Sequence, residues 1–153
     1  NQRNLHIIKT IFHWEMLRTW KHYLKQSVFY KDKNMSVPVG GKHLILELWS
    51  DNADILKDAN KLRDICSFAA RKANAIIISN DFHHFGGDFG VSGVVILAES
   101  HITIHTWPEE KYCAIDVFMC GNCDPINTLE YFKTALHATK CEMMTIQRPI
   151  KGN

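Results

Sequence analysis

The sequence predicts an α+β fold, a two-layer sandwich in which a mainly antiparallel sheet carries two helices on one face. About six short runs are β-branched or alternate apolar with polar residues, and turn residues separate them. Two other segments carry apolar residues at helical spacing. The chain has 153 residues, of which 46% are hydrophobic and 22% charged, as expected for one globular domain. Two helices can cover one face of such a sheet.

Residues 1–34 differ in charge from the rest of the chain. They contain seven Lys or Arg against two acidic residues, whereas the remainder contains eleven against fourteen. Apolar residues recur there every four positions: Ile8, Phe12, Met16, Trp20 and Leu24. We expect a basic, helical N-terminal extension that docks or is solvated rather than one lying on a membrane. The main domain is expected to span residues 35–153.

The main domain is expected to open with a strand over residues 43–49. Asp51 and Asn52 then offer N-cap side chains for a helix. The apolar face of this helix consists of Ile55, Ala59, Leu62, Cys66, Ala69 and Ala73. Further strands are predicted over residues 75–79, 94–98, 102–107 and 113–119.

A second helix is predicted to begin at Asp124, where the acid caps the helix and Pro125 takes the first helical position. Its buried face consists of Leu129, Phe132 and Leu136. A final strand is predicted over residues 141–146, and Pro149 ends it.

Alternation along the strands sorts the side chains by face. Ile102 and Ile104 point to one side, and His105 and Trp107 to the other. In the next strand the aliphatic residues Ile115, Val117 and Met119 oppose Ala114, Asp116, Phe118 and Cys120. We expect His105, Trp107 and Cys120 to share the face without helices. Because that aromatic face needs cover, we expect a homodimer with the two sheets packed face to face, an αββα arrangement.

Composition excludes several classes of partner. The net charge is only +2 and no basic stripe is interleaved with aromatics, which argues against nucleic acid. No apolar run approaches the roughly 18 residues that span a bilayer, so no membrane partner is expected. The cysteines are odd in number and irregularly spaced, and no signal peptide is recognisable. We therefore expect a reducing, cytoplasmic setting.

One run of residues carries chemistry, and it reads Glu99-Ser100-His101-Ile102-Thr103-Ile104-His105-Thr106-Trp107-Pro108-Glu109. A serine in this setting can attack its own preceding carbonyl, which converts the Glu99–Ser100 amide into an ester. His105 can then remove the α-hydrogen of Ser100, because imidazole has a suitable pKa. Elimination and hydrolysis would leave a pyruvoyl group at position 100. Ser92, beside two glycines, is a candidate donor to the oxyanion.

A pyruvoyl group would make the chain a decarboxylase. Its ketone forms a Schiff base with a substrate amine and accepts electrons as CO2 departs. The Cys120 thiol can then protonate the carbon. Taken singly, Ser92 and Ser100 are ordinary turn serines, His105 a sheet histidine and Cys120 a small buried hydrophobe. The whole run with its spacings favours the chemical interpretation.

The run resembles the prokaryotic S-adenosylmethionine decarboxylase proenzymes over roughly residues 40–150. The resemblance implies cleavage between Glu99 and Ser100, a β chain ending at Glu99, a pyruvoyl-bearing α chain and an (αβ)2 dimer. It gives Ser92 and His105 roles in processing and makes Cys120 the proton donor. It also places Phe85 and Trp107 in the adenosyl pocket and Glu109 on the ribose. The implied product serves spermidine biosynthesis.

Departures from the family pattern leave alternatives open. The loop over residues 83–90 lacks an expected proline, is one residue longer and adds Asp88. Some members of the family act on ornithine or arginine, whose distal cation an acid such as Asp88 can bind. A solvated turn residue is the favoured interpretation of Asp88. A catalytically silent regulatory paralogue is a third possibility, against which the intact motif argues.

Cys120 and Cys123 form a CxxC motif, which in other proteins supports redox or zinc chemistry. A metal site needs two more ligands, and the only dense candidates are His83 and His84, adjacent residues whose side chains diverge on a strand. We therefore expect no metal. His43 and Glu47 are interpreted as structural.

Overall fold

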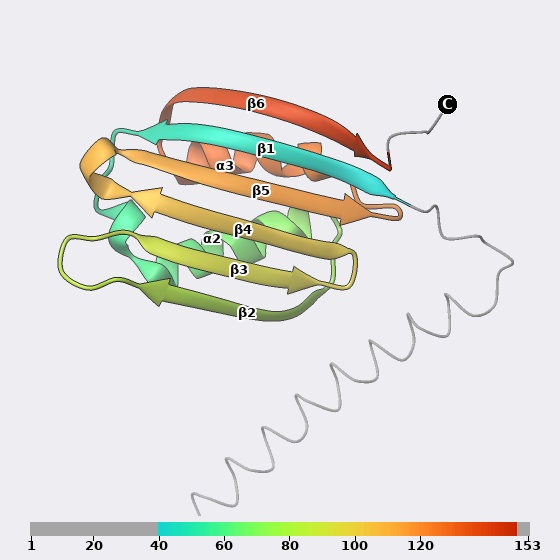
Figure 1. Ribbon diagram of the computed structural model, residues 1–153, viewed down its shortest axis with the longest axis horizontal. Coiled ribbons are helices and arrows are strands. Elements are labelled where there is room, and N and C mark those ends of the chain that lie inside the picture. Colours follow the sequence, from blue (N-terminus) through green and yellow to red (C-terminus); the bar gives the residue numbers. More distant parts are fainter. Residues whose placement is uncertain (1–39, 150–153) are drawn as a thin grey trace, which may run out of the picture. The chain divides into compact units, whose positions relative to one another are not determined.

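The computed structural model describes residues 40–149, which form one six-stranded sheet with two α-helices (Figure 1). The strands are β1 (Gly41–Ser50), β2 (Ile77–His84), β3 (Val91–Leu97), β4 (Ser100–Trp107), β5 (Tyr112–Cys120) and β6 (Ala138–Arg148). The helices are α2 (Ala59–Lys72) and α3 (Leu129–Ala135), with short 3-10 helices η1 (Ile55–Lys57), η2 (Pro108–Glu110) and η3 (Pro125–Thr128). The helix predicted within residues 1–34 lies outside the described residues.

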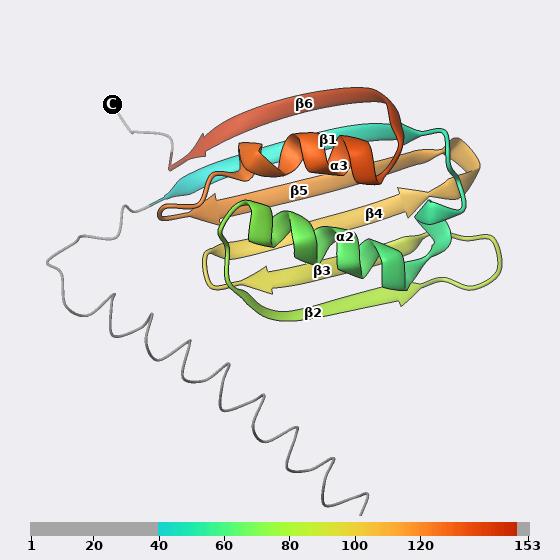
Figure 2. The ribbon, with the colours of Figure 1, turned by 180° about the vertical axis from the view of Figure 1, so that it is seen from behind.

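The sheet has the strand order β2-β3-β4-β5-β1-β6, and every neighbouring pair is antiparallel. Both α-helices lie across the same face of the sheet (Figure 2). The predicted two-layer α+β sandwich is therefore confirmed for one chain. None of the helices within residues 40–149 is long and apolar enough to cross a membrane.

The predicted division of side chains between the two faces of the sheet is also confirmed. Ile102 and Ile104 are fully buried in the core under the helices, while His105 is exposed and Trp107 is 41% exposed on the other face. The same alternation holds along β5, where Ile115, Val117 and Met119 are buried. The face without helices, called the open face below, therefore carries His105, Trp107 and Cys120.

The predicted cap of the first helix is wrong. The helix begins at Ala59, and the Asp58 carboxylate accepts hydrogen bonds from the backbone N–H groups of Asn60 and Lys61 at 3.1 and 3.0 Å. Asn52 instead accepts from the N–H of Ile55 at 3.3 Å, in the turn just ahead of η1. The chain makes this extra turn because Leu56 has to reach the core, where it is fully buried.

The second helix begins as predicted. The Asp124 carboxylate accepts from the N–H of Ile126 at 3.2 Å, and Pro125 occupies the first helical position. The first turn is a 3-10 helix, after which α3 buries Phe132, and Leu136 at its C-cap is also buried.

The largest boundary error concerns β2, which begins two residues later than predicted and continues to His84. Residues 78–81 are exposed, so apolar alternation does not mark this part of the strand. β2 lies at the edge of the sheet and is held by backbone pairing with β3. β3 in turn starts at Val91, which places Ser92 in a strand and not in a turn.

Candidate active site

Glu99 and Ser100 lie where the chain turns from β3 into β4. Ser100 has a φ of 144°, a conformation that favours glycine because a Cβ atom crowds the backbone there. Such a conformation costs of order 1–3 kcal/mol in a non-glycine residue. Part of that strain is released if the peptide bond ahead of Ser100 breaks.

Two hydrogen bonds hold Glu99. The backbone N–H of Cys120 donates to the Glu99 carbonyl oxygen at 3.1 Å. The Glu99 carboxylate is buried and accepts from the backbone N–H of Ile76 at 2.9 Å. The N–H of Cys120 therefore polarises the carbonyl that Ser100 would attack, in the way that a backbone donor stabilises an oxyanion.

The Ser100 hydroxyl has a histidine neighbour that the sequence pattern does not indicate. Ser100 Oγ lies 3.1 Å from Nδ1 of His101. Alternation along a regular strand places adjacent side chains on opposite faces, and so gives no signal of this contact. The sequence pattern also gives no signal of the hydrogen bond from the Cys120 N–H, because side-chain patterns do not report backbone donors.

The structure brings Ser92 and His105 together on the open face. They are directly opposite in the β3–β4 pair, and Ser92 Oγ lies 2.9 Å from Nδ1 of His105. A hollow of about 240 Å³ adjoins them and is lined also by Asp81 and His83. The pair therefore faces a space that a ligand or another chain can enter.

These two sets of residues lie at opposite ends of the sheet. Five residues along β4 separate Ser100 from His105, which at about 3.3 Å per residue is roughly 17 Å. Cys120 ends β5 at the Ser100 end, whereas the β2–β3 loop and η2 lie at the other end (Figure 1). We call Glu99, Ser100 and Cys120 the Ser100 group. We call Ser92, His105, Phe85, Trp107 and Glu109 the His105 group.

The aromatic members of the His105 group present exposed rings. Trp107 stacks on Tyr112 with ring centroids 5.3 Å apart. Phe85 is 59% exposed and meets His83 edge to face at 4.9 Å. Glu109, in η2 directly after β4, is exposed. These rings and this carboxylate suit a ligand that is flat in one part and carries hydroxyl groups in another.

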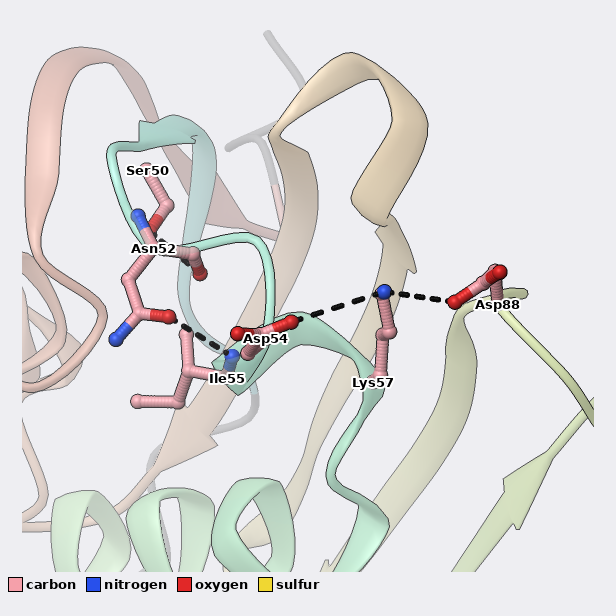
Figure 3. A network of polar contacts seen from close by, with 6 residues as sticks. All are labelled: Ser50, Asn52, Asp54, Ile55, Lys57 and Asp88. Carbon is pink, nitrogen blue, oxygen red and sulfur yellow. Dashed lines mark hydrogen bonds and ion pairs between the residues drawn. The ribbon is translucent and has the colours of Figure 1, made fainter.

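Asp88 already has a cationic partner within the chain. Its carboxylate accepts from Lys57 Nζ at 2.9 Å, and Lys57 also lies 3.7 Å from Asp54 (Figure 3). The hydrogen bond with Lys57 holds the pKa of Asp88 below its usual range. The loop that bears Asp88 is thus tied to η1, where Asn52 and Ser50 order the preceding turn.

Cys120 and Cys123 border a second hollow of about 220 Å³ at the end of β5. Burial, with smaller contributions from Glu99 and Cys120, raises the pKa of the Cys123 thiol to about 11. Zinc ligation and thiol exchange both use the thiolate, which this environment disfavours. Within residues 40–149 no three His, Cys, Asp or Glu side chains gather in a way that could hold a metal ion.

The two residues interpreted as structural make structural contacts. His43 Nε2 lies 3.0 Å from Asp116 Oδ1, and the Tyr112 hydroxyl donates to Glu47. Both pairs lie across the β1–β5 ladder on the open face.

Comparison with known proteins connects this chain to one family. The family profile for S-adenosylmethionine decarboxylase matches residues 42–149. An S-adenosylmethionine decarboxylase proenzyme from Thermodesulfovibrio yellowstonii is 46% identical over 113 residues, covering 73% of this chain and 81% of the relative. One from Pyrococcus horikoshii is 41% identical over 112 residues, covering 72% and 80%.

A solved structure agrees with the sequence comparisons. The crystal structure of the adenosylmethionine decarboxylase from Aquifex aeolicus matches with a TM-score of 0.67 and 31% identity, covering 75% of this chain and 95% of that one. The region matched by the family profile contains the sheet except for its first residue, Gly41, together with both helices and both residue groups. The chain therefore belongs to the S-adenosylmethionine decarboxylase family.

Proposed function

We propose that this chain is a self-processing enzyme that converts S-adenosylmethionine to decarboxylated S-adenosylmethionine and CO2, using a pyruvoyl group made from Ser100. The observation that carries the proposal is the backbone at Ser100, strained and preceded by a carbonyl to which Cys120 donates a hydrogen bond. Relatives at 41–46% identity are named proenzymes, which supports self-processing. Ser100 itself is the precursor that such a group requires.

Processing begins when Ser100 Oγ attacks the Glu99 carbonyl carbon. The C–N bond breaks, and Glu99 becomes esterified to the Ser100 hydroxyl. His105 then removes the α-hydrogen of Ser100, and the carboxylate of Glu99 leaves as the C terminus of the β chain. The remaining dehydroalanine takes up water and loses ammonia. The pyruvoyl group so formed withdraws electrons from the substrate as CO2 departs.

A homodimer follows from the separation of the two residue groups. His105 lies roughly 17 Å from Ser100 along its own strand, too far to remove the α-hydrogen there. Two copies packed open face to open face bring the Ser100 end of each to the His105 end of the other when the two-fold axis between the sheets runs perpendicular to the strands. Each site then takes Ser100 and Cys120 from one copy and Ser92 and His105 from the second.

The His105 group also supports the choice of substrate. Phe85 and Trp107 offer exposed rings on which an adenine can pack, and Glu109 offers acceptors for ribose hydroxyls. Asp88 gives little support to ornithine or arginine as the substrate, because its carboxylate is already paired with Lys57 of the same chain. We further propose a cytoplasmic setting, since all five cysteines are unpaired.

Release of CO2 from labelled S-adenosylmethionine, ornithine and arginine tests the substrate. We expect both the natural protein and Asp88→Asn to turn over S-adenosylmethionine alone. The Asp88 carboxylate ties its own loop to η1 through Lys57 and is not expected to bind the substrate. Turnover of ornithine or arginine alone would refute this choice. Loss of such turnover in Asp88→Asn would assign the distal cation to that carboxylate.

Cys120→Ala is expected to split normally or slowly but to turn over at least about 100-fold more slowly, the usual contribution of a positioned acid. Splitting continues because alanine retains the backbone N–H that bonds the Glu99 carbonyl. Intact mass reports splitting and CO2 release reports turnover. Cys141→Ala, a half-buried cysteine on β6, is the matched control. Undiminished turnover by Cys120→Ala would remove its role as proton donor.

A further inference from the structure

We propose that His101 is the base that takes the hydroxyl proton of Ser100 in the first step of self-processing. This inference rests on the proposed function and adds a residue to it. The Ser92–His105 pair lies at the far end of the same strand and is assigned to the later α-hydrogen step. Within the same chain, the proton acceptor that contacts the Ser100 hydroxyl is Nδ1 of His101.

The contact between the two neighbours depends on the unusual backbone of Ser100. Adjacent side chains in a regular strand point to opposite faces and do not meet. The φ of 144° at Ser100 departs from strand geometry, and Oγ lies 3.1 Å from Nδ1 of His101. The backbone conformation that strains the chain at Ser100 therefore also places a hydrogen-bond acceptor, Nδ1 of His101, beside the Ser100 hydroxyl.

The surroundings of His101 hold its ring in place and keep it neutral. It is half-buried, its cross-strand neighbours are Ile96 on β3 and Phe118 on β5, and the Phe118 ring lies 5.9 Å away in a T-shaped arrangement. Burial lowers the pKa of His101 from its ordinary value of 6.5. The charged groups that face it are His43 on β1, Asp116 on β5 and Arg148 on β6.

These groups act in opposite directions on the imidazole. His43 and Arg148 lower the pKa of His101 further, whereas Asp116, which is itself paired with His43, raises it. A neutral imidazole with its proton on Nε2 presents Nδ1 as an acceptor, which is the atom that faces Ser100.

The step is a balanced rearrangement. The proton moves from Ser100 Oγ to His101 Nδ1 as the Oγ–C bond to Glu99 forms. The negative charge on the former carbonyl oxygen is stabilised by the N–H of Cys120 at 3.1 Å. The C–N bond then breaks, and the imidazolium returns the proton to the departing nitrogen, which becomes the amino group of residue 100. No other reactant is consumed.

His101→Asn tests the inference, because the amide oxygen of asparagine takes the approximate place of Nδ1 and accepts a hydrogen bond without being basic. The control is His137→Asn, remote from both residue groups, at a residue with a φ of 51° that asparagine tolerates. Intact mass follows splitting of the full chain over time. Hydroxylamine at neutral pH distinguishes an ester, which it cleaves, from an amide.

We expect His101→Asn to form the ester at least about 100-fold more slowly and to accumulate uncut chain that resists hydroxylamine. His105→Ala should instead accumulate uncut chain that hydroxylamine cleaves. The rate at which the natural protein splits should fall as acid protonates His101, whose pKa lies below the ordinary histidine value, and this dependence should be lost in His101→Asn. Added imidazole should restore splitting to His101→Gly, and no restoration would overturn the inference.

The outcomes separate the two proposals. If His101→Asn splits as fast as the natural protein, His101 is not the base, while the proposed function stands. If the natural protein itself never splits, the proposed function fails and the role of His101 fails with it.

Discussion

Ser100→Ala is expected to leave one continuous chain of 153 residues with no measurable decarboxylation of S-adenosylmethionine. Alanine has no hydroxyl to attack the Glu99 carbonyl, so neither the ester nor the pyruvoyl group can form. The loss is complete because the electron sink is made from this one side chain. Intact mass before and after prolonged incubation measures splitting, and release of labelled CO2 measures activity.

The matched control is Ser67→Ala, a serine in α2 on the helical side of the sheet. It should split and turn over like the natural chain. A Ser100→Ala protein that still decarboxylates would end the proposal of a self-made electrophile. Splitting of the natural chain with no turnover of any amine substrate would instead favour the regulatory paralogue.

Co-expression of Ser100→Ala with His105→Ala is expected to restore activity that neither variant has alone. In a mixed dimer, the chain with His105→Ala contributes Ser100 and Cys120, and the chain with Ser100→Ala contributes Ser92 and His105. Random pairing makes about half of the dimers mixed, and each mixed dimer has one complete site out of two. Activity should therefore reach about a quarter of the natural value. Differently tagged chains, purified through both tags, allow the mixed dimer to be measured directly.

The control for this experiment is co-expression of Ser100→Ala with Cys120→Ala. Both residues belong to the Ser100 group, so the mixed dimer has one site without Ser100 and one site without Cys120. Turnover should stay low. Restoration in this control, or none with His105→Ala, contradicts sites shared between two copies. Analytical ultracentrifugation that shows only monomer would also remove the αββα dimer.

Local sequence rules predicted much of the fold. Alternation placed Ile102 and Ile104 under the helices and His105 on the open face, because burial on one side of a strand selects every second residue. Asp124 followed by Pro125 marked a helix start by its own backbone chemistry. Asp51 does not cap the first helix as predicted, because the chain first makes an extra turn that buries Leu56 in the core. The bounds predicted for β2 were wrong, because pairing at the edge of a sheet does not require apolar alternation.

The sequence by itself was enough to predict which side chains carry the chemistry, since the spacing of Ser92, Ser100, His105 and Cys120 is a property of the chain alone. Only the tertiary structure decided how they are grouped. Each residue of a strand advances the chain by about 3.3 Å, so Ser100 and His105 stand at opposite ends of one strand. The proposed function therefore requires a second copy to bring them together. The structure also decided that His101 touches Ser100, because that contact depends on a backbone angle that no residue pattern reports.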